Sequence, residues 1–245
     1  MGEVSEDWKV KTVVPLFKKS CKEKHGNYRS VSLIPVIDEQ QRQRIWKALH
    51  EISSLTCVKF YYRRNEETAY INVRSKGGCF SNVGYGNNAR LLSLKIPHCL
   101  HFGVITHEFL HAIGFQHEQC RSDRDKYIKI LWENISPRLK YNFNLLNTNN
   151  LNMTYDYGSI MQYGRYAFSK NKKPTMVPVN DSNIELGQYR GLSTLDVLKI
   201  NKLYNCGHET HKGLQQMFTR LILGMAGLTY EVKLHQSPRF MRSSE

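Results

Sequence analysis

Three histidines and one glutamate, all between His107 and His117, have the types and the spacing to bind a metal ion and to use it. His107 and His111 are four residues apart, so on a helix both imidazoles lie on one face, about 6 Å apart along the axis, and can hold one ion. Glu108 lies about 100° further round the helix, where its carboxylate reaches a water bound to the ion rather than the ion itself. This is the position that a general base requires.

The third histidine, His117, can reach the same ion only if the helix ends before it. In a continued helix its side chain would point about 240° away from that of His111. Gly114 can take a left-handed conformation and end the helix, so that the chain turns back towards the ion. Three neutral imidazoles and a water form an open, catalytic zinc site. We therefore expect one Zn2+ ion per chain, bound by His107, His111 and His117.

The pattern H-E-x-x-H alone is a weak signal, because two histidines on a helix are often only part of a polar face. Together with Gly114 and His117 it indicates a zinc peptidase. Zinc would lower the pKa of its bound water from about 16 towards about 7. Glu108 would take the proton as the water attacks a peptide carbonyl, and would then pass it to the leaving amine. This mechanism needs no nucleophilic serine or cysteine.

The elements that must position these residues are predicted from the periodicity of the apolar side chains. A helix is expected from about Asp38 to Ser53, because Ile45, Leu49 and Ile52 share one of its faces and Asp38 can act as its N-cap. Segments rich in β-branched and aromatic residues are expected to form strands at 57–62, 69–74 and 91–96.

The remaining elements lie in and after the histidine stretch. Residues 102–115, which carry the first two histidines, are expected to form a buried helix. The chain after Asn144 is rich in asparagine and is expected to be mostly irregular, until Ser193 opens a last helix with Asp196 in a capping-box pattern. The candidates for its core-facing side chains are Leu195, Leu198 and Leu203. This order of elements predicts an α+β fold with the site between two halves.

Composition limits the class of protein. The chain has 245 residues, of which 40% are hydrophobic and 23% charged, as in folded globular proteins. The formal net charge is +14, but the basic residues are spread along the sequence, so we interpret them as a solvated surface and expect no nucleic-acid partner. The apolar cluster in residues 213–228 is interrupted by Arg220 and is too short to span a membrane, so no membrane insertion is expected. We expect a monomer.

The six cysteines lie far apart, and none forms a C-x-x-C pair, which argues against a structural zinc finger. Their even number is compatible with disulfides and with a secreted, extracellular protein. The alternative is a set of reduced, buried thiols in a cytosolic protein. The first residues lack a long apolar run behind a basic start, so they do not resemble a signal peptide.

The stretch HEFLHAIGFQHEQCRSDRD, residues 107–125, resembles the signature of the astacin family of metzincin zinc peptidases. That signature continues past the third histidine, and the residues that match it there are Glu118, Arg121, Asp123, Arg124 and Asp125. The segment SIMQY, residues 159–163, resembles the Met-turn of the family. The resemblance implies that Met161 lies beneath the metal. It also implies that Tyr163 can ligate zinc and swing away to stabilise the oxyanion of the transition state.

The resemblance covers about residues 28–206 and is closest to the fish hatching-enzyme and six-cysteine branch. It implies a two-lobed catalytic domain, with a twisted, mostly parallel sheet and two long helices in an upper lobe and a mostly irregular lower lobe with a C-terminal helix. Residues 1–27 are then an N-terminal segment that could be a propeptide remnant, and residues 207–245 a flexible tail. The resemblance also implies a structural role for Glu118, and the disulfides Cys57–Cys206 and Cys79–Cys99.

The sequence departs from the family pattern at three positions. Gln162 stands where the Met-turn usually has histidine, and Cys120 replaces a small or hydroxyl residue. Cys21 lacks the nearby partner expected in the hatching-enzyme branch. Because the mature N-terminal segment of the family lies near the glutamate that corresponds to Glu118, Cys21 could pair with Cys120.

Three functions are compatible with the sequence. The first is a zinc endopeptidase that hydrolyses extracellular proteins, and the second is a catalytically inactive relative that binds protein or glycan surfaces through the same cleft. The third is a basic nucleic-acid-binding protein, which has only the net charge in its favour. The intact Glu108 favours the first, because an inactive relative has no need of a base.

Overall fold

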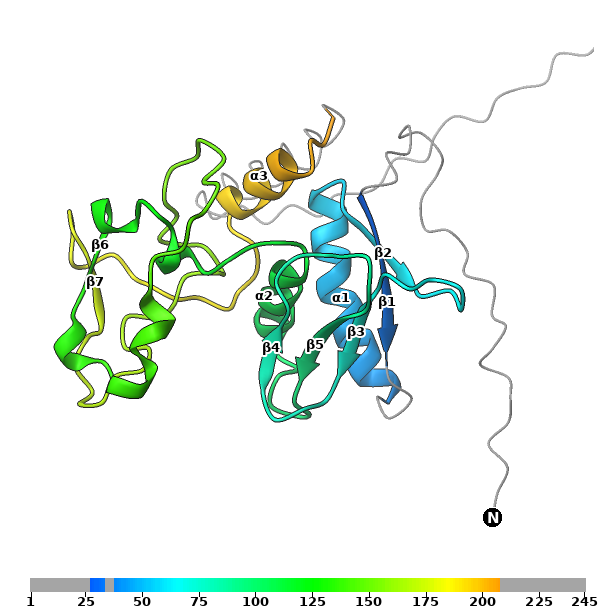
Figure 1. The fold of residues 1–245 in the computed structure, drawn as a ribbon, viewed down its shortest axis with the longest axis horizontal. Coiled ribbons are helices and arrows are strands. Elements are labelled where there is room, and N and C mark those ends of the chain that lie inside the picture. The colour runs from blue at the N-terminus through cyan, green and yellow to red at the C-terminus, as the bar shows by residue number, and fades with distance from the viewer. Residues whose placement is uncertain (1–26, 34–37, 208–245) are drawn as a thin grey trace, which may run out of the picture.

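The computed structural model describes residues 27–33 and 38–207. Nearly all of the expected N-terminal segment 1–27 and tail 207–245, including Cys21, lies outside the described residues. Figure 1 shows the sheet with two helices beside it, a region of loops and short turns on the other side of these helices, and a third helix across the top.

A five-stranded sheet forms one layer of the molecule, in the order β2-β1-β3-β5-β4. The strands are β1 (Tyr28–Leu33), β2 (Lys59–Tyr62), β3 (Ile71–Arg74), β4 (Cys79–Ser81) and β5 (Arg90–Leu94). β2, β1, β3 and β5 run parallel to one another, whereas β4 runs antiparallel to β5, so the mostly parallel sheet is confirmed.

Two strands of this sheet were not predicted, for different physical reasons. β1 lies in the interior of the sheet, but two of its three buried residues, Arg29 and Ser30, are polar, so its sequence lacks the apolar run typical of a buried parallel strand. β4 has only three residues, and they are exposed or half-exposed, so it offers no apolar pattern.

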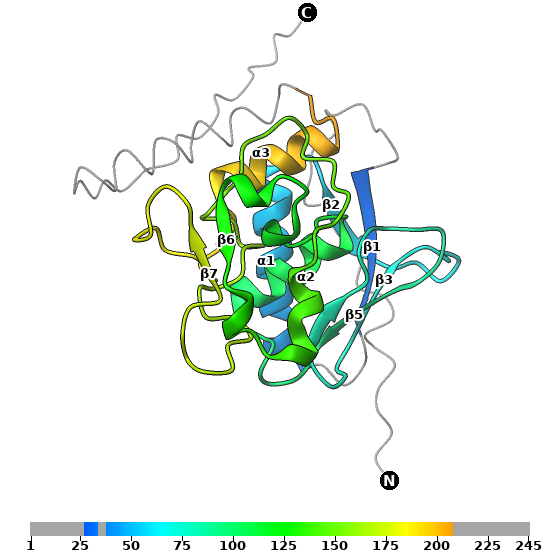
Figure 2. The same ribbon diagram turned by 60° about the vertical axis from the view of Figure 1, so that its left-hand side comes forward.

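Helices α1 (Glu39–Leu55) and α2 (Phe102–Ala112) pack side by side against the sheet (Figure 2). Asp38 caps α1 as predicted, because its side chain accepts a hydrogen bond from the backbone N–H of Gln41 at 2.8 Å. Ile45, Leu49 and Ile52 are buried, as their shared face predicted. They belong to the main core between helices and sheet, together with Val31, Val73, Leu92, Ile105 and Phe109.

The region beyond α2 is mostly irregular, as expected for the lower lobe. Its two strands, β6 (Ile128–Ile130) and β7 (Met176–Pro178), form an antiparallel ladder. Its four short 3-10 helices are η3 (Glu118–Cys120), η4 (Arg124–Lys126), η5 (Trp132–Asn134) and η6 (Pro137–Phe143). A second, smaller core holds it together, formed by Ile128, Ile130, Ile135, Phe143, Tyr155, Met176 and Leu186.

Two buried arginines hold the loops of this lobe in place through hydrogen bonds to backbone carbonyls. Arg124 donates to the carbonyls of Gln119 and Phe143, both at 2.7 Å. Arg121 donates to two carbonyls of residues 153–154. Buried carbonyls must find donors, so these guanidinium groups fix loops that have no ladder of their own.

Helix α3 (Thr194–Leu203) crosses the top of the molecule (Figure 1). Ser193 is its N-cap and forms the predicted capping box with Asp196, which is therefore confirmed. The disulfide Cys57–Cys206 ties the end of this region to the end of α1, across 149 residues of sequence. The second disulfide, Cys79–Cys99, spans 20 residues.

The buried face of α3 differs from the prediction. Leu195, Leu198 and Leu203 are half-buried or exposed, so their assignment to the core is wrong. The buried side chains are instead Asp196, Val197, Lys199 and Ile200. Two of these are charged because this face meets backbone N–H groups and a buried carboxylate, which apolar side chains could not satisfy.

Within the described residues, none of the helices combines the length and the hydropathy needed to cross a membrane.

Candidate metal centre

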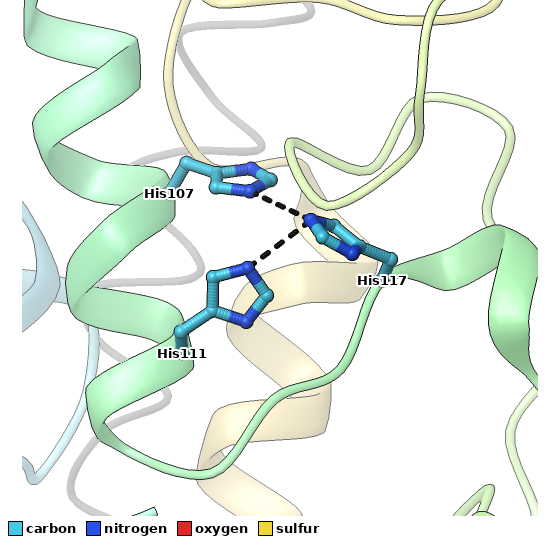
Figure 3. A group of neighbouring side chains, drawn as sticks. All are labelled: His107, His111 and His117. Atoms are coloured by element: carbon cyan, nitrogen blue, oxygen red, sulfur yellow. Dashed lines mark hydrogen bonds between the residues drawn. The ribbon is translucent and has the colours of Figure 1, made fainter. Parts of the chain in front are cut away.

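The end of α2 brings the third histidine round to the first two. The helix ends at Ala112, three residues before the predicted end, with Ile113 as its C-cap, because Gly114 follows with φ of +108°. The backbone N–H of Gly114 donates to the carbonyl of His111 at 2.9 Å, which closes the turn. Figure 3 shows His107 and His111 projecting from the helix and His117 facing them from the segment that turns back.

The Nε2 atom of His117 lies 3.1 Å from the Nε2 atoms of both His107 and His111. The other ring nitrogens are held by the backbone: Nδ1 of His107 donates to the carbonyl of Ile160, and Nδ1 of His111 to the carbonyl of Phe115, both at 2.8 Å. A carbonyl can only accept, so in the neutral rings each Nδ1 carries the proton and each Nε2 presents a lone pair.

This donor set fits a zinc ion. The neutral ring of His117 can donate a proton from Nε2 to at most one of its two neighbours, so at least one close nitrogen pair has no proton between it. Nitrogens about 2.0–2.1 Å from a tetrahedral zinc ion lie about 3.3 Å apart, close to the spacing seen here. Carbonyls that hold the far nitrogens are the usual partners of metal-bound imidazoles.

The electrostatic setting keeps the rings neutral. Burial lowers the pKa of His111 to about 4 and that of His117 to about 2, and it also lowers the pKa of His107. A lowered pKa favours the uncharged imidazole near neutral pH, and only that form can ligate a metal.

Glu108 lies beside the triad and is 5% exposed. Its Oε2 atom has no hydrogen-bond partner in the part of the chain that the structure describes. Burial raises the pKa of this carboxyl group to about 8, and a cation held by the imidazoles would lower it again. Buried carboxylate oxygens normally accept a hydrogen bond, and a water bound to the metal would supply the donor.

The predicted Met-turn contacts one of the three histidines, because the carbonyl of Ile160 accepts the Nδ1 proton of His107. Met161 is 2% exposed and packs in the main core, and its carbonyl accepts the backbone N–H of Glu118 at 3.0 Å. Gln162 bonds to Tyr155 and to the carbonyl of Tyr163, so it takes part in the packing of the lower lobe.

Tyr163 stands against the third histidine. Its ring centroid lies 4.4 Å from that of His117, and the two ring planes are tilted by 51°. The aromatic rings of Phe143 and Phe168 lie 6.0 and 5.5 Å from Tyr163. Burial raises the pKa of the Tyr163 hydroxyl, so it remains a proton donor at neutral pH.

Glu118 is the centre of a buried polar cluster directly after His117. Its Oε1 atom accepts from Lys199 at 2.6 Å, from the backbone N–H of Asp156 at 2.8 Å and from Arg121 at 3.1 Å. Two buried cations and a peptide N–H thus compensate one buried carboxylate, which gives Glu118 a structural environment.

Cys120 is buried and has no disulfide partner among the described residues. Its Sγ atom lies 3.4 Å from the carbonyl oxygen of Asn142, and burial raises its pKa to about 11. Because Cys21 lies outside the described residues, the pairing of Cys21 with Cys120 stays a prediction.

Sequence reasoning missed two kinds of contributor to this site. Ile160 and Phe115 act through backbone carbonyls, and no side-chain pattern identifies these. Asp196 was recognised only as a capping residue, and Lys199 was not singled out. The sequence did hold a signal for the last two: Asp196 and Lys199 carry opposite charges one turn apart and are flanked by apolar residues of α3.

Comparisons with known proteins add an independent line of support. The sequence model of the peptidase family described as Astacin matches residues 27–205. High choriolytic enzyme 1 of Oryzias latipes is 48% identical over 160 residues, which cover 65% of this chain and 59% of that protein. An astacin-like metalloendopeptidase of Coturnix japonica is 46% identical over 176 residues, which cover 71% of this chain and 43% of that protein. The chain thus spans about half the length of these curated relatives.

A solved structure supports the same relationship. It is that of high choriolytic enzyme 1, described as a hatching enzyme zinc-protease from Oryzias latipes, the medaka fish. It matches with a TM-score of 0.73 at 42% sequence identity and covers 76% of this chain and 94% of that chain.

Proposed function

Because the chain belongs to the astacin family of peptidases, we propose that it is a zinc-dependent endopeptidase in which His107, His111 and His117 hold the ion and Glu108 is the general base. The observation that carries the proposal is the convergence of three histidine Nε2 atoms, together with the buried carboxylate oxygen of Glu108 on the same helix, which has no hydrogen-bond partner among the described residues. A catalytically inactive binding protein would need neither feature.

The residues of the chain divide the chemistry among them. When bound, Zn2+ supplies a Lewis acid that makes water acidic and polarises the peptide carbonyl. Glu108 takes the proton of the attacking water and delivers it to the leaving amine. Tyr163, next to His117, donates a hydrogen bond to the oxyanion as negative charge develops. Met161 anchors the turn that holds His107, since its side chain belongs to the main core and the carbonyl of the preceding residue, Ile160, accepts the Nδ1 proton of His107.

We further propose that the protein acts outside the cell on protein substrates. The two disulfides fit an oxidising compartment. The relatives named as choriolytic and hatching enzymes make egg-coat proteins the first substrates to try.

Replacing the base tests the proposed function. Glu108→Gln keeps the size of the side chain but cannot take a proton, so the variant should bind one zinc ion per chain and lose peptide hydrolysis by about 10³-fold. Zinc content measured by atomic absorption and turnover of a fluorogenic peptide give the two readouts.

The matched control is Glu133→Gln, the same change at an exposed glutamate, which should keep full activity. Hydrolysis in Glu108→Gln at the wild-type rate would refute the assigned base. Activity that survives removal of zinc by 1,10-phenanthroline would refute the metal mechanism altogether.

A further inference from the structure

Two charged side chains of α3 point into the interior, close to the metal centre. Asp196 and Lys199 are three residues apart, so they share one face of the helix, and they are 3% and 5% exposed. Lys199 bonds to Glu118, which directly follows the ligand His117. Asp196 accepts hydrogen bonds from Ser159 and Ile160 of the Met-turn. The carbonyl of Ile160 in turn binds a second ligand, His107.

The carboxylate of Asp196 is saturated with donors. Its Oδ2 atom accepts the backbone N–H groups of Ile160 and Ser193, both at 3.0 Å, and its Oδ1 atom accepts the hydroxyl of Ser159 at 2.6 Å. The hydroxyl oxygen of Ser159 in turn accepts the backbone N–H of Met161 at 3.0 Å. One buried carboxylate therefore fixes three consecutive residues of the turn.

The same turn holds a zinc ligand. The carbonyl of Ile160, whose N–H is bound by Asp196, accepts the Nδ1 proton of His107 at 2.8 Å. A displaced Ile160 would leave this proton without its acceptor and free the imidazole to rotate. Outer partners of metal ligands typically change metal affinity by about 10- to 100-fold when they are removed.

We propose that Asp196 is a positioning residue of the metal centre, which holds the imidazole of His107 in its metal-binding orientation through Ser159 and Ile160. This role is separate from the part of Asp196 in the capping box of α3, where its carboxylate accepts the backbone N–H of Ser193. The proposal rests on the proposed zinc site, so zinc binding by the wild-type chain is measured first. Failure of the wild-type chain to bind zinc would refute the proposed function and the positioning role with it.

The experiment compares three variants of the full chain by zinc affinity, measured by competition with a chromophoric chelator, and by the visible spectrum of the Co2+-substituted protein. Asp196→Ala removes the acceptor for Ile160 and should weaken zinc binding by about 10-fold or more and alter the Co2+ spectrum. Asp196→Asn keeps one oxygen for the N–H of Ile160, and its amide can donate to Ser159, so it should restore most of the affinity.

The control for a purely structural role is Ser193→Ala. It removes the hydroxyl that caps α3 and should lower the melting temperature, because a lost N-cap costs about 1 kcal/mol. It leaves the bond between Asp196 and Ile160 in place, so zinc affinity should stay within about twofold of wild type.

Two results would overturn the positioning role. One is wild-type zinc affinity and an unchanged Co2+ spectrum in Asp196→Ala. The other is a loss of affinity in Ser193→Ala as large as that in Asp196→Ala. If Asp196→Ala does not fold, Ser159→Ala removes the branch of the connection that runs through the Ser159 hydroxyl and leaves the bond between Asp196 and Ile160 in place. It should weaken zinc binding by about threefold or more, and an unchanged affinity there would contradict the proposed route through Ser159.

Discussion

At the scale of single residues, the decisive group is the imidazole of His117. Its Nε2 atom has two nitrogen neighbours at 3.1 Å, and each of these belongs to a ring whose proton is bound elsewhere. Such a cluster of lone pairs is repulsive unless a cation lies among them. Tyr163 is packed against this ring, and this contact is the basis of the role proposed for its hydroxyl.

Tyr163→Phe tests the assigned role of this hydroxyl. Loss of one donor to a developing oxyanion typically costs about 10²-fold or more in turnover, with a smaller change in KM. Steady-state kinetics on a peptide substrate measure both constants. Tyr141→Phe, at a tyrosine of the same lobe that is 64% exposed, is the matched control and should behave as wild type. An unchanged kcat in Tyr163→Phe would remove this residue from the mechanism.

At the scale of elements, the helices were largely predictable because their periodicity records one apolar face. The spacing of His107, His111 and His117 with Gly114 predicted the end of α2 for a similar reason, since a helix can present only one face to one ion. The inward face of α3 was not predictable, because Asp196 and Lys199 are buried only through partners that come from distant parts of the sequence. The interior strand β1 was not predictable either, because two of its three buried residues, Arg29 and Ser30, are polar.

Gly114→Ala tests whether the turn after α2 sets the metal site. At φ of +108° an L-residue is strained by about 1–2 kcal/mol, although a Cβ atom would meet only Leu203, at 3.9 Å. We expect a lower melting temperature and weaker zinc binding, measured by thermal unfolding and by chelator competition. Gly77→Ala is the control, because this glycine has no positive φ and no atom within 4 Å of the added carbon. Wild-type zinc affinity in Gly114→Ala would contradict the role of the turn.

At the scale of the whole molecule, α3 connects parts that are far apart in sequence. The residues that follow it make two of these connections: Cys206 is joined to Cys57, just beyond the end of α1, and the hydroxyl of Tyr204 donates to the carbonyl of Ile113 at the end of α2. The buried charges of α3 hold the lower-lobe segments that carry the metal site. The disulfide therefore stabilises the relative position of the two lobes.

The two disulfides should contribute unequally to stability. The loop-entropy relation assigns about 5 kcal/mol to the bond that spans 149 residues and about 3 kcal/mol to the one that spans 20. The double replacements Cys57→Ser with Cys206→Ser and Cys79→Ser with Cys99→Ser can be compared by urea unfolding. A greater loss of unfolding free energy on removal of Cys79–Cys99 would contradict this assignment.

The most direct test is anomalous X-ray diffraction at the zinc absorption edge, on crystals of the full chain grown with zinc. We expect one peak per chain, about 2.0–2.1 Å from the Nε2 atoms of His107, His111 and His117. A well-ordered triad without a peak, or a His117 ring turned away from an ion held by other residues, would contradict the proposed zinc site.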